Sequence, residues 1–137
     1  MPLPRGHTLR MTAPPDDVET VHALLVDVWE DFPAISAADR ARFETALIEL
    51  TSNVIRHADS GTGVRCDLSI AVGDGRIEAT LIHTGEAGGI DLVPRPMPDE
   101  LSEQGRGIPL IRALVDELEY SRAGASNHWR ISRTLAR

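Results

Sequence analysis

The stretch from 36 to 58 carries an apolar helical face beside a polar stripe, and no other feature of the chain constrains the fold as much. Its apolar residues recur at the spacing of one helix face and are Phe43, Ala46, Leu47, Leu50, Val54 and Ala58. The polar stripe consists of Glu49, Asn53 and His57, which recur every four residues. Four residues turn slightly more than once around a helix, so successive members lie closer to the apolar face: Glu49 is at its edge and His57 is nearly inside it. Buried polar groups cost free energy unless something pairs with them, such as a hydrated metal ion or a reacting hydroxyl. The stretch therefore predicts an amphipathic helix with either a capped, partly buried edge or one wall of a functional site.

Hydrophobic periodicity and turn residues predict further elements on both sides of this helix. In chain order we expect a strand at 7–13, a helix capped by Asp16 or Asp17 and running to 31, the helix at 36–58 with Asp39 in a capping-box position, strands at 64–72 and 76–83, a helix up to 118, and strands at 119–123 and 129–134. Helices and hairpins thus occur in runs rather than in strict alternation. Such an order is typical of an α+β fold, a two-layer sandwich with helices on one face of a mostly antiparallel sheet. The 137 residues suffice for one such domain, with 8–135 as its core.

Charge and cysteine content limit the partners and the compartment. The net charge is −7 and no run of Lys or Arg occurs, which argues against a nucleic-acid surface, because phosphate neutralisation needs clustered positive charge. An acidic surface can instead attract a basic patch on a partner protein. Cys66 is the only cysteine and alternation places it in the core, so no disulfide forms within the chain; no apolar run reaches the length of a signal sequence or membrane span. We therefore expect a cytoplasmic protein that binds neither nucleic acid nor membrane.

A second motif precedes the last predicted helix. Gly105 and Gly107 flank Arg106 just before an apolar-periodic run from Ile108 to Leu118. Glycines at a helix entrance let a phosphate approach the free backbone N–H groups, where the helix dipole is positive, and Arg106 adds a charge for that phosphate. A flexible loop end with a surface arginine is the alternative interpretation. Upstream, 84–104 is a long irregular segment rich in Gly and Pro, and such segments are usually functional or disordered.

Together these motifs resemble the ATP-binding domain of the histidine-kinase, gyrase and chaperone ATPase superfamily (GHKL), and most closely its anti-sigma-factor serine kinase branch. The matching residues, in the family's order, are Glu49, Leu50, Asn53 and His57; His83, Thr84 and Gly85; Gly105, Arg106, Gly107 and Ile108; and Asp116, Glu117 and Leu118. The resemblance covers about residues 8 to 135, and its motifs are individually loose but jointly specific. It implies the same α+β sandwich as the order of the elements.

The resemblance also implies a protein kinase that depends on ATP and Mg²⁺. Glu49 would be the general base that deprotonates a serine or threonine hydroxyl on a partner, and Asn53 would bind Mg²⁺. The residues that the resemblance assigns to nucleotide binding are Asn53, His57, His83, Gly85, Gly105, Arg106, Gly107 and Ile108. For His57, a satisfied histidine at the core edge is the alternative to a phosphate contact. Residues 84–104 would form the ATP lid.

The partners implied by the resemblance are a sigma factor and an anti-sigma-factor antagonist of the STAS type, and a homodimer is a further expectation. Where the family has an aspartate that accepts a hydrogen bond from the adenine amino group, this chain has His83, whose neutral imidazole offers one acceptor nitrogen that could take that bond. The family's pattern is D-x-G-x-G, whereas in this chain His83 and Gly85 are followed by Gly88 and Gly89, as if two residues had been inserted. A partner-binding module of the same fold, with weak or no ATP binding, is therefore the alternative to a kinase. A metal-dependent hydrolase is disfavoured, because the five histidines lack a ligand spacing such as HxxxH.

Overall fold

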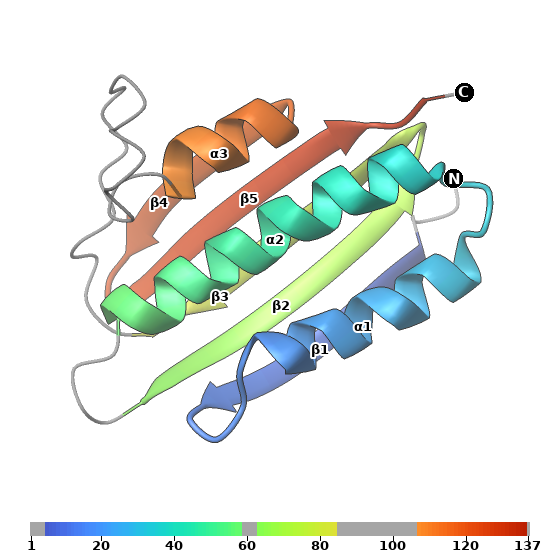
Figure 1. The fold of residues 1–137 in the computed structure, drawn as a ribbon. Coiled ribbons are helices and arrows are strands. Elements are labelled where there is room, and N and C mark those ends of the chain that lie inside the picture. The colour runs from blue at the N-terminus through green and yellow to red at the C-terminus, as the bar shows by residue number, and fades with distance from the viewer. Residues whose placement is uncertain (1–4, 59–62, 85–106, 137) are drawn as a thin grey trace, which may run out of the picture.

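The computed structural model describes residues 5–58, 63–84 and 107–136, which fold into two layers (Figure 1). The elements are β1 (Arg5–Ala13), α1 (Val18–Asp31), α2 (Ala37–Ala58), β2 (Val64–Gly73), β3 (Arg76–His83), α3 (Gly107–Leu114), β4 (Glu117–Ala123) and β5 (Ser126–Thr134). The described strands form one antiparallel sheet in the order β1-β2-β3-β5-β4, and the three described helices lie on one face of it. The predicted α+β sandwich is confirmed.

Side-chain caps begin the first two helices where the sequence predicts them. The Asp17 carboxylate accepts a hydrogen bond from the Glu19 amide at 2.9 Å, and Thr20 completes a capping box at the start of α1. At α2, the Ser36 hydroxyl accepts from the Asp39 amide at 3.1 Å. The Asp39 carboxylate binds residues near the end of the chain instead of returning to the Ser36 amide, so α2 has an N-cap without the predicted capping box.

Helix α3 is shorter than predicted. It ends at Leu114 instead of Leu118, and β4 begins at Glu117 instead of 119. The Asp116 amide donates to the Ser132 carbonyl at 2.8 Å, and β4 pairs with β5 from Glu117 onward. Residues 117 and 118 lie at the end of a run whose apolar spacing suits a helix, but they pair with β5 as part of a strand. Tertiary contacts here outweigh local propensity.

The core lies between the helices and the sheet. Alternate residues of β2 point into it, and Val64, Cys66, Leu68 and Ile70 are all buried, as their alternation predicts. Burial raises the pKa of the Cys66 thiol to about 11, so this free thiol stays protonated near neutral pH. The apolar face of α2 supplies the facing layer through Phe43, Ala46, Leu47, Leu50 and Val54.

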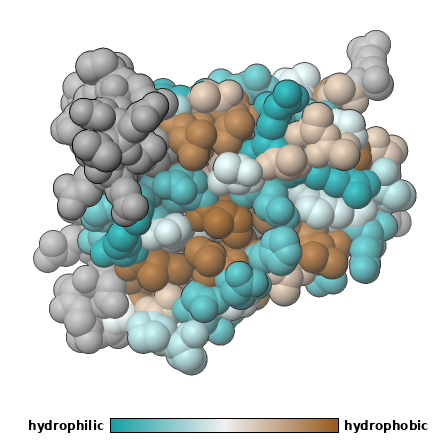
Figure 2. Space-filling view, in the orientation of Figure 1, coloured by the Kyte–Doolittle hydropathy of each residue, from teal (hydrophilic) through white to brown (hydrophobic). Residues whose placement is uncertain are grey.

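Apolar side chains are visible in several areas of the helical face. Figure 2 shows this face, with brown apolar patches among teal side chains. Partly buried apolar residues that pack against the core from the helices include Trp29, Ile48, Ile55 and Ile108. Among the described residues, Val26 is the only large apolar side chain that is exposed, at 41%. None of the described helices has the length and apolar character that a membrane crossing requires.

A buried ion pair joins the start of α2 to the last strand. Asp39 is 3% exposed; its Oδ1 accepts from Arg133 Nε at 2.9 Å, and its Oδ2 accepts from the Ala136 amide at 2.8 Å. Arg133 also donates to the Leu114 carbonyl at 2.6 Å, at the end of α3. The Ala136 amide and the Arg133 guanidinium hold the pKa of Asp39 below its ordinary value. The cluster therefore fastens the start of α2, the end of α3 and the end of β5 to one another.

We expect Asp39→Asn to lower the free energy of unfolding by about 2–3 kcal/mol, because Arg133 and Ala136 lose a charged acceptor in a buried site. Chemical denaturation followed by circular dichroism measures this. Asp67→Asn is the control: it removes an ion pair with Arg10, whose side chain is 87% exposed, and should cost no more than about 1 kcal/mol. Equal stability of the two variants would contradict the role given to the Asp39 cluster.

Candidate nucleotide site

Three segments that carry predicted site residues meet at one end of the sandwich. In Figure 1, the carboxyl end of α2, the carboxyl end of β3 and the amino end of α3 all lie at that end. Helices α2 and α3 pack against each other, and strand register places His83, the last residue of β3, opposite Asn127 on β5. The structure thus brings the helix with Glu49 and Asn53 close to the first residues of α3, as the predicted site requires.

The polar stripe of α2 is buried in its middle and exposed at its end. Glu49 is half-buried, Asn53 is 7% exposed, and His57 is exposed. The prediction that His57 lies nearly inside the core is therefore wrong, and so is its interpretation as a core-edge histidine. Helical spacing places His57 on a side of α2, but burial also needs a packed neighbour, and no described element covers that side of the last turn.

The side-chain oxygen of Asn53 is directed at a positive charge. Its Oδ1 accepts a hydrogen bond from Arg56 Nη2, within one turn of the same helix. Arg56 is exposed, so its guanidinium reaches Asn53 from the solvent side. An amide oxygen that binds a guanidinium also has the partial negative charge that a metal cation requires.

The side-chain oxygens of Asn53 and Glu49 on α2 are of the kind that bind Mg²⁺. This ion prefers hard oxygen ligands and usually keeps several waters, so it takes only one or two protein ligands beside substrate phosphates. The Asn53 amide oxygen is a hard oxygen of this kind, and the Glu49 carboxylate lies four residues earlier along α2. The residues present therefore fit a magnesium ion that is bound together with phosphates.

His83 ends β3 with both ring nitrogens hydrogen-bonded inside the protein. The residue is 3% exposed; Nε2 accepts from Trp129 Nε1 at 3.0 Å, and Nδ1 donates to the Thr84 carbonyl at 2.8 Å. An indole nitrogen only donates and a carbonyl only accepts, so these partners select the neutral tautomer with the proton on Nδ1. The ring therefore has no acceptor left for an adenine amino group, contrary to the expectation that the imidazole could take the bond of the family's carboxylate.

Asn127 completes the network around His83 from β5. It is fully buried; its Oδ1 accepts from the Tyr120 hydroxyl at 2.6 Å and from Arg122 Nη1 at 3.0 Å, and its Nδ2 donates to the His83 carbonyl at 3.3 Å. The Tyr120 ring packs on Trp129 with 4.5 Å between ring centroids. Asn127 thus fixes the backbone of His83, while Trp129 fixes its ring.

Burial lowers the pKa of His83 below its ordinary value. The hydrogen bond to the Thr84 carbonyl acts in the opposite direction, and the nearby charges of Arg122 and His128 lower the pKa further. His83 therefore stays neutral at a pH where an ordinary histidine begins to take up a proton. A neutral ring is what the bond from Trp129 requires.

The remaining predicted residues lie at the limits of the described segments or outside them. The Thr84 amide donates to the Arg65 carbonyl and its hydroxyl accepts from the Arg65 amide, each at 3.1 Å. Gly107 begins α3 and Ile108 is half-buried beside it. The first N–H groups of a helix lack intrahelical partners, so they are suited to phosphate oxygens. Gly85, Gly105, Arg106 and the predicted lid beyond Thr84 lie outside the described residues.

Sequence reasoning missed three residues of this site: Arg56, Trp129 and Asn127. Arg56 follows Asn53 by three positions on a helix, a spacing at which side chains meet, so the sequence held a signal for it. Trp129 and Asn127 lie 46 and 44 residues from His83, and only the register of β5 against β3 brings them to it. No local pattern in the sequence indicates that contact.

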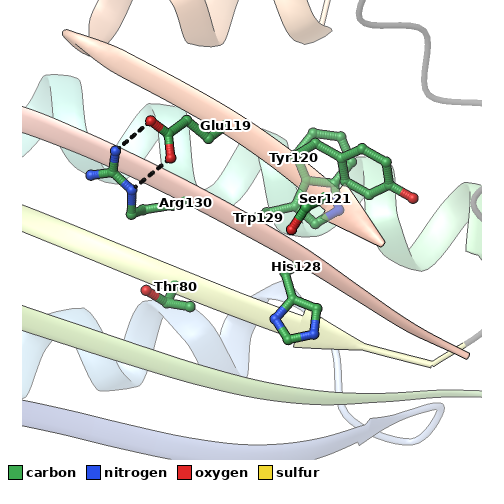
Figure 3. Close-up of a pocket in the computed structure, with 7 residues that line it drawn as sticks. All are labelled: Thr80, Glu119, Tyr120, Ser121, His128, Trp129 and Arg130. Atoms are coloured by element: carbon green, nitrogen blue, oxygen red, sulfur yellow. Dashed lines mark hydrogen bonds and ion pairs between the residues drawn. The ribbon is translucent and has the colours of Figure 1, made fainter. Parts of the chain in front are cut away.

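A separate open pocket of about 480 Å³ lies on the helix-free face of the sheet (Figure 3). Its lining residues are Thr80, Glu119, Tyr120, Ser121, His128, Trp129 and Arg130. Thr80, Ser121 and His128 alternate with core residues along their strands, so they point away from the helices. The Arg130 guanidinium forms ion pairs with three glutamates at 2.7–3.4 Å, which compensate its charge. The pocket includes none of the predicted site residues.

We expect the stability of the fold to depend on the neutral form of His83. Unfolded histidine has a pKa of about 6.5 and the pKa of folded His83 is lower, so its contribution is complete above about pH 6.5 and is lost as the pH falls through the folded pKa. His83→Gln keeps an acceptor for Trp129 and a donor for Thr84 without titrating. Urea denaturation should therefore show a larger loss of stability for wild type than for His83→Gln between about pH 7 and pH 5. Parallel pH profiles of the two proteins would contradict this assignment.

A family model described as the histidine kinase-like ATPase domain matches residues 11–133. No curated protein matches the chain significantly. Among solved structures, the RsbU and RsbW domains of Rv1364c from Mycobacterium tuberculosis give a TM-score of 0.66 at 19% identity, over 96% of this chain and 33% of that chain. The histidine kinase domain of the blue-light activated histidine kinase EL346 from Erythrobacter litoralis gives 0.54 at 18% identity, over 85% of this chain and 63% of that chain.

The catalytic domain of the histidine kinase ThkA, in a nucleotide-free form, gives a TM-score of 0.52 at 10% identity, over 93% of this chain and 97% of that chain. The chain therefore spans less than two thirds of the Rv1364c and EL346 chains. At these identities the three structures show a common fold and nothing finer. The family match extends over nearly the whole described fold, and the chain belongs to the histidine kinase-like ATPase domain family.

Proposed function

We propose that the chain is a regulatory serine/threonine kinase of the anti-sigma-factor type, which uses ATP to phosphorylate an anti-sigma-factor antagonist and sequesters a sigma factor. The observation that carries the proposal is the meeting of α2, with Glu49 and Asn53, and the amino end of α3 at one end of a histidine kinase-like ATPase fold. Phosphoryl transfer depends mostly on positioning and charge neutralisation, so a carboxylate, a metal-binding amide and unpaired helix N–H groups are the groups it needs.

The two α2 residues have different roles in this proposal. Asn53 would hold Mg²⁺ through Oδ1 after Arg56 has left that oxygen, and bound Mg²⁺ supplies positive charge to the phosphates. The Glu49 carboxylate makes no hydrogen bond or ion pair with the part of the chain that the structure describes. It is therefore available to accept the proton of a serine or threonine hydroxyl as the phosphoryl group is transferred to the oxygen.

The phosphates would bind at the start of α3. The amides of Gly107 and Ile108 belong to the first turn of that helix, where N–H groups and the helix dipole favour anions. The proposal adds Gly105 and Arg106 to this phosphate site and residues 84–104 as the lid. His57 is exposed on α2, so it is available for a phosphate contact.

The acidic composition supports the proposed partners. A net charge of −7 favours association with a basic protein surface, such as the DNA-binding regions of a sigma factor. The antagonist, a STAS-type protein, would present the hydroxyl that Glu49 deprotonates. The proposal places the protein in the cytoplasm, where these partners act, and includes the formation of a homodimer.

A partner-binding module without kinase activity is the second candidate, and two observations favour it. The ring of His83 offers no acceptor to an adenine base, and Arg56 engages the oxygen that Mg²⁺ would need. Such a module would bind its partner through the same fold and transfer no phosphate. Phosphate transfer is therefore the property that separates the two candidates.

We expect Glu49→Gln to reduce phosphorylation of a purified STAS-type antagonist by roughly 10²–10⁴-fold, because the amide cannot accept the hydroxyl proton. Because Glu49 is only half-buried, the free energy of unfolding of the Glu49→Gln protein should differ from that of wild type by about 1 kcal/mol or less. Transfer of labelled phosphate from ATP, with denaturation in parallel, measures both quantities.

Glu44→Gln is the matched control, because Glu44 lies on the same helix but contacts Trp29 and His22 of α1. It should leave the rate of transfer unchanged. Asn53→Ala should weaken the binding of ATP in the presence of Mg²⁺ and have a smaller effect in its absence. A Glu49→Gln protein that transfers phosphate at the wild-type rate would refute the assignment of the base, and a wild type that transfers none would favour the binding module.

A further inference from the structure

We infer that the proposed nucleotide site binds purine nucleoside triphosphates through their phosphates and Mg²⁺ and does not select adenine over guanine. The inference rests on the proposed function and specifies its substrate class. It follows from the hydrogen bonds at the end of β3, where the resemblance to the family places the residue that reads the base.

Base selection requires an unpaired polar group at that position. Adenine carries a donor amino group where guanine carries a carbonyl acceptor, so an acceptor side chain attracts the first and repels the second. A site that is built to hydrogen-bond one ligand rejects an analogue that leaves its buried polar group unpaired. A side chain whose polar atoms are all bonded within the protein has neither effect.

His83 is such a side chain. Its Nε2 accepts from Trp129 at 3.0 Å, its Nδ1 donates to the Thr84 carbonyl at 2.8 Å, and the residue is only 3% exposed. The ring nitrogen that could accept from adenine points to an indole in the core. Because the two partners have opposite hydrogen-bonding roles, rotation of the ring or a change of tautomer breaks both bonds.

The neighbouring polar groups are also engaged by the protein. Both ends of the Asn127 amide are bonded: Oδ1 to Tyr120 and Arg122, and Nδ2 to the His83 carbonyl. The Thr84 hydroxyl oxygen accepts from the Arg65 amide at 3.1 Å. That hydroxyl can both accept and donate, so it can pair with either base and selects neither. In the described part of the chain, the end of β3 thus presents no side-chain group that distinguishes the two bases.

The charge state of the ring supports the same conclusion. Burial and the charges of Arg122 and His128 keep the pKa of His83 low, so the ring stays neutral and does not become an imidazolium that would attract the guanine carbonyl. Affinity then comes from the phosphates, which ATP and GTP share. The start of α3 and Asn53 are the described groups that fit them.

The test is calorimetric titration of the wild-type chain, in the presence of Mg²⁺, with non-hydrolysable analogues of ATP and of GTP. We expect the two Kd values to agree within about three-fold. A preference for the ATP analogue of about ten-fold or more, the effect of one well-formed hydrogen bond to a charged group, would overturn the inference and leave the proposed function intact. If neither analogue binds at millimolar concentration, the proposed function fails, and the inference fails with it.

A pair of variants tests whether His83 decides base selection. His83→Asp places a carboxylate at the end of β3 and should create a preference for the ATP analogue of about ten-fold or more. His128→Asp adds the same charge to the other face of the sheet, on β5, and should keep the wild-type ratio. A folded His83→Asp protein that binds both analogues equally would overturn the role of this position. Circular dichroism shows whether the variant is folded. If it is not, the ratio of the two Kd values for the wild-type chain alone decides whether the site selects adenine.

Discussion

The hydrogen bond from Trp129 to His83 connects the hydrophobic core to the candidate site. Trp129 is 1% exposed, and a buried indole N–H needs an acceptor, which Nε2 of His83 supplies at 3.0 Å. Acceptance at Nε2 places the ring proton on Nδ1, and that proton binds the Thr84 carbonyl. The hydrogen bond that a core tryptophan needs therefore determines the tautomer of His83 and its bond to the Thr84 carbonyl. It also leaves the His83 ring without an acceptor for a nucleotide base.

The same arrangement separates the two parts of nucleotide recognition. In the proposed function, phosphate binding would depend on the start of α3 and on Asn53 of α2. The packing of α3 on α2 brings these two helices together. In the same proposal, base recognition would depend on the end of β3, where the side chains of His83 and Asn127 are hydrogen-bonded within the protein. On this proposal, the chain would keep a phosphate site and would lack the contact that identifies adenine.

Much of the fold could be predicted because its elements have clear periodicities. The apolar face of α2 and the alternation in β2 both correspond to buried residues, and Asp17 caps α1 as expected. The end of α3 could not be predicted, because its residues have helical spacing and only pairing with β5 makes 117–123 a strand. Local spacing identifies a face of an element, whereas the partner of that face depends on the whole fold.

The site was predictable to a similar degree. Spacing identified Glu49 and Asn53 as neighbours on one helix, but the exposure of His57 depends on what packs against the last turn of α2. The hydrogen bonds of His83 depend on Trp129 and Asn127, 46 and 44 residues away, which no local pattern connects to it. The sequence therefore showed that a histidine replaces the expected aspartate, and the structure showed that this histidine is bonded to the core.

In this structure His83 is a neutral ring held between Trp129 and Thr84. Nuclear magnetic resonance of ¹⁵N-labelled protein near neutral pH tests it most directly, because nitrogen–nitrogen coupling crosses an N–H···N hydrogen bond. We expect coupling between Trp129 Nε1 and His83 Nε2, with the ring proton on Nδ1. A proton on Nε2, or a Trp129 indole signal without coupling to His83, would show that this hydrogen bond does not exist.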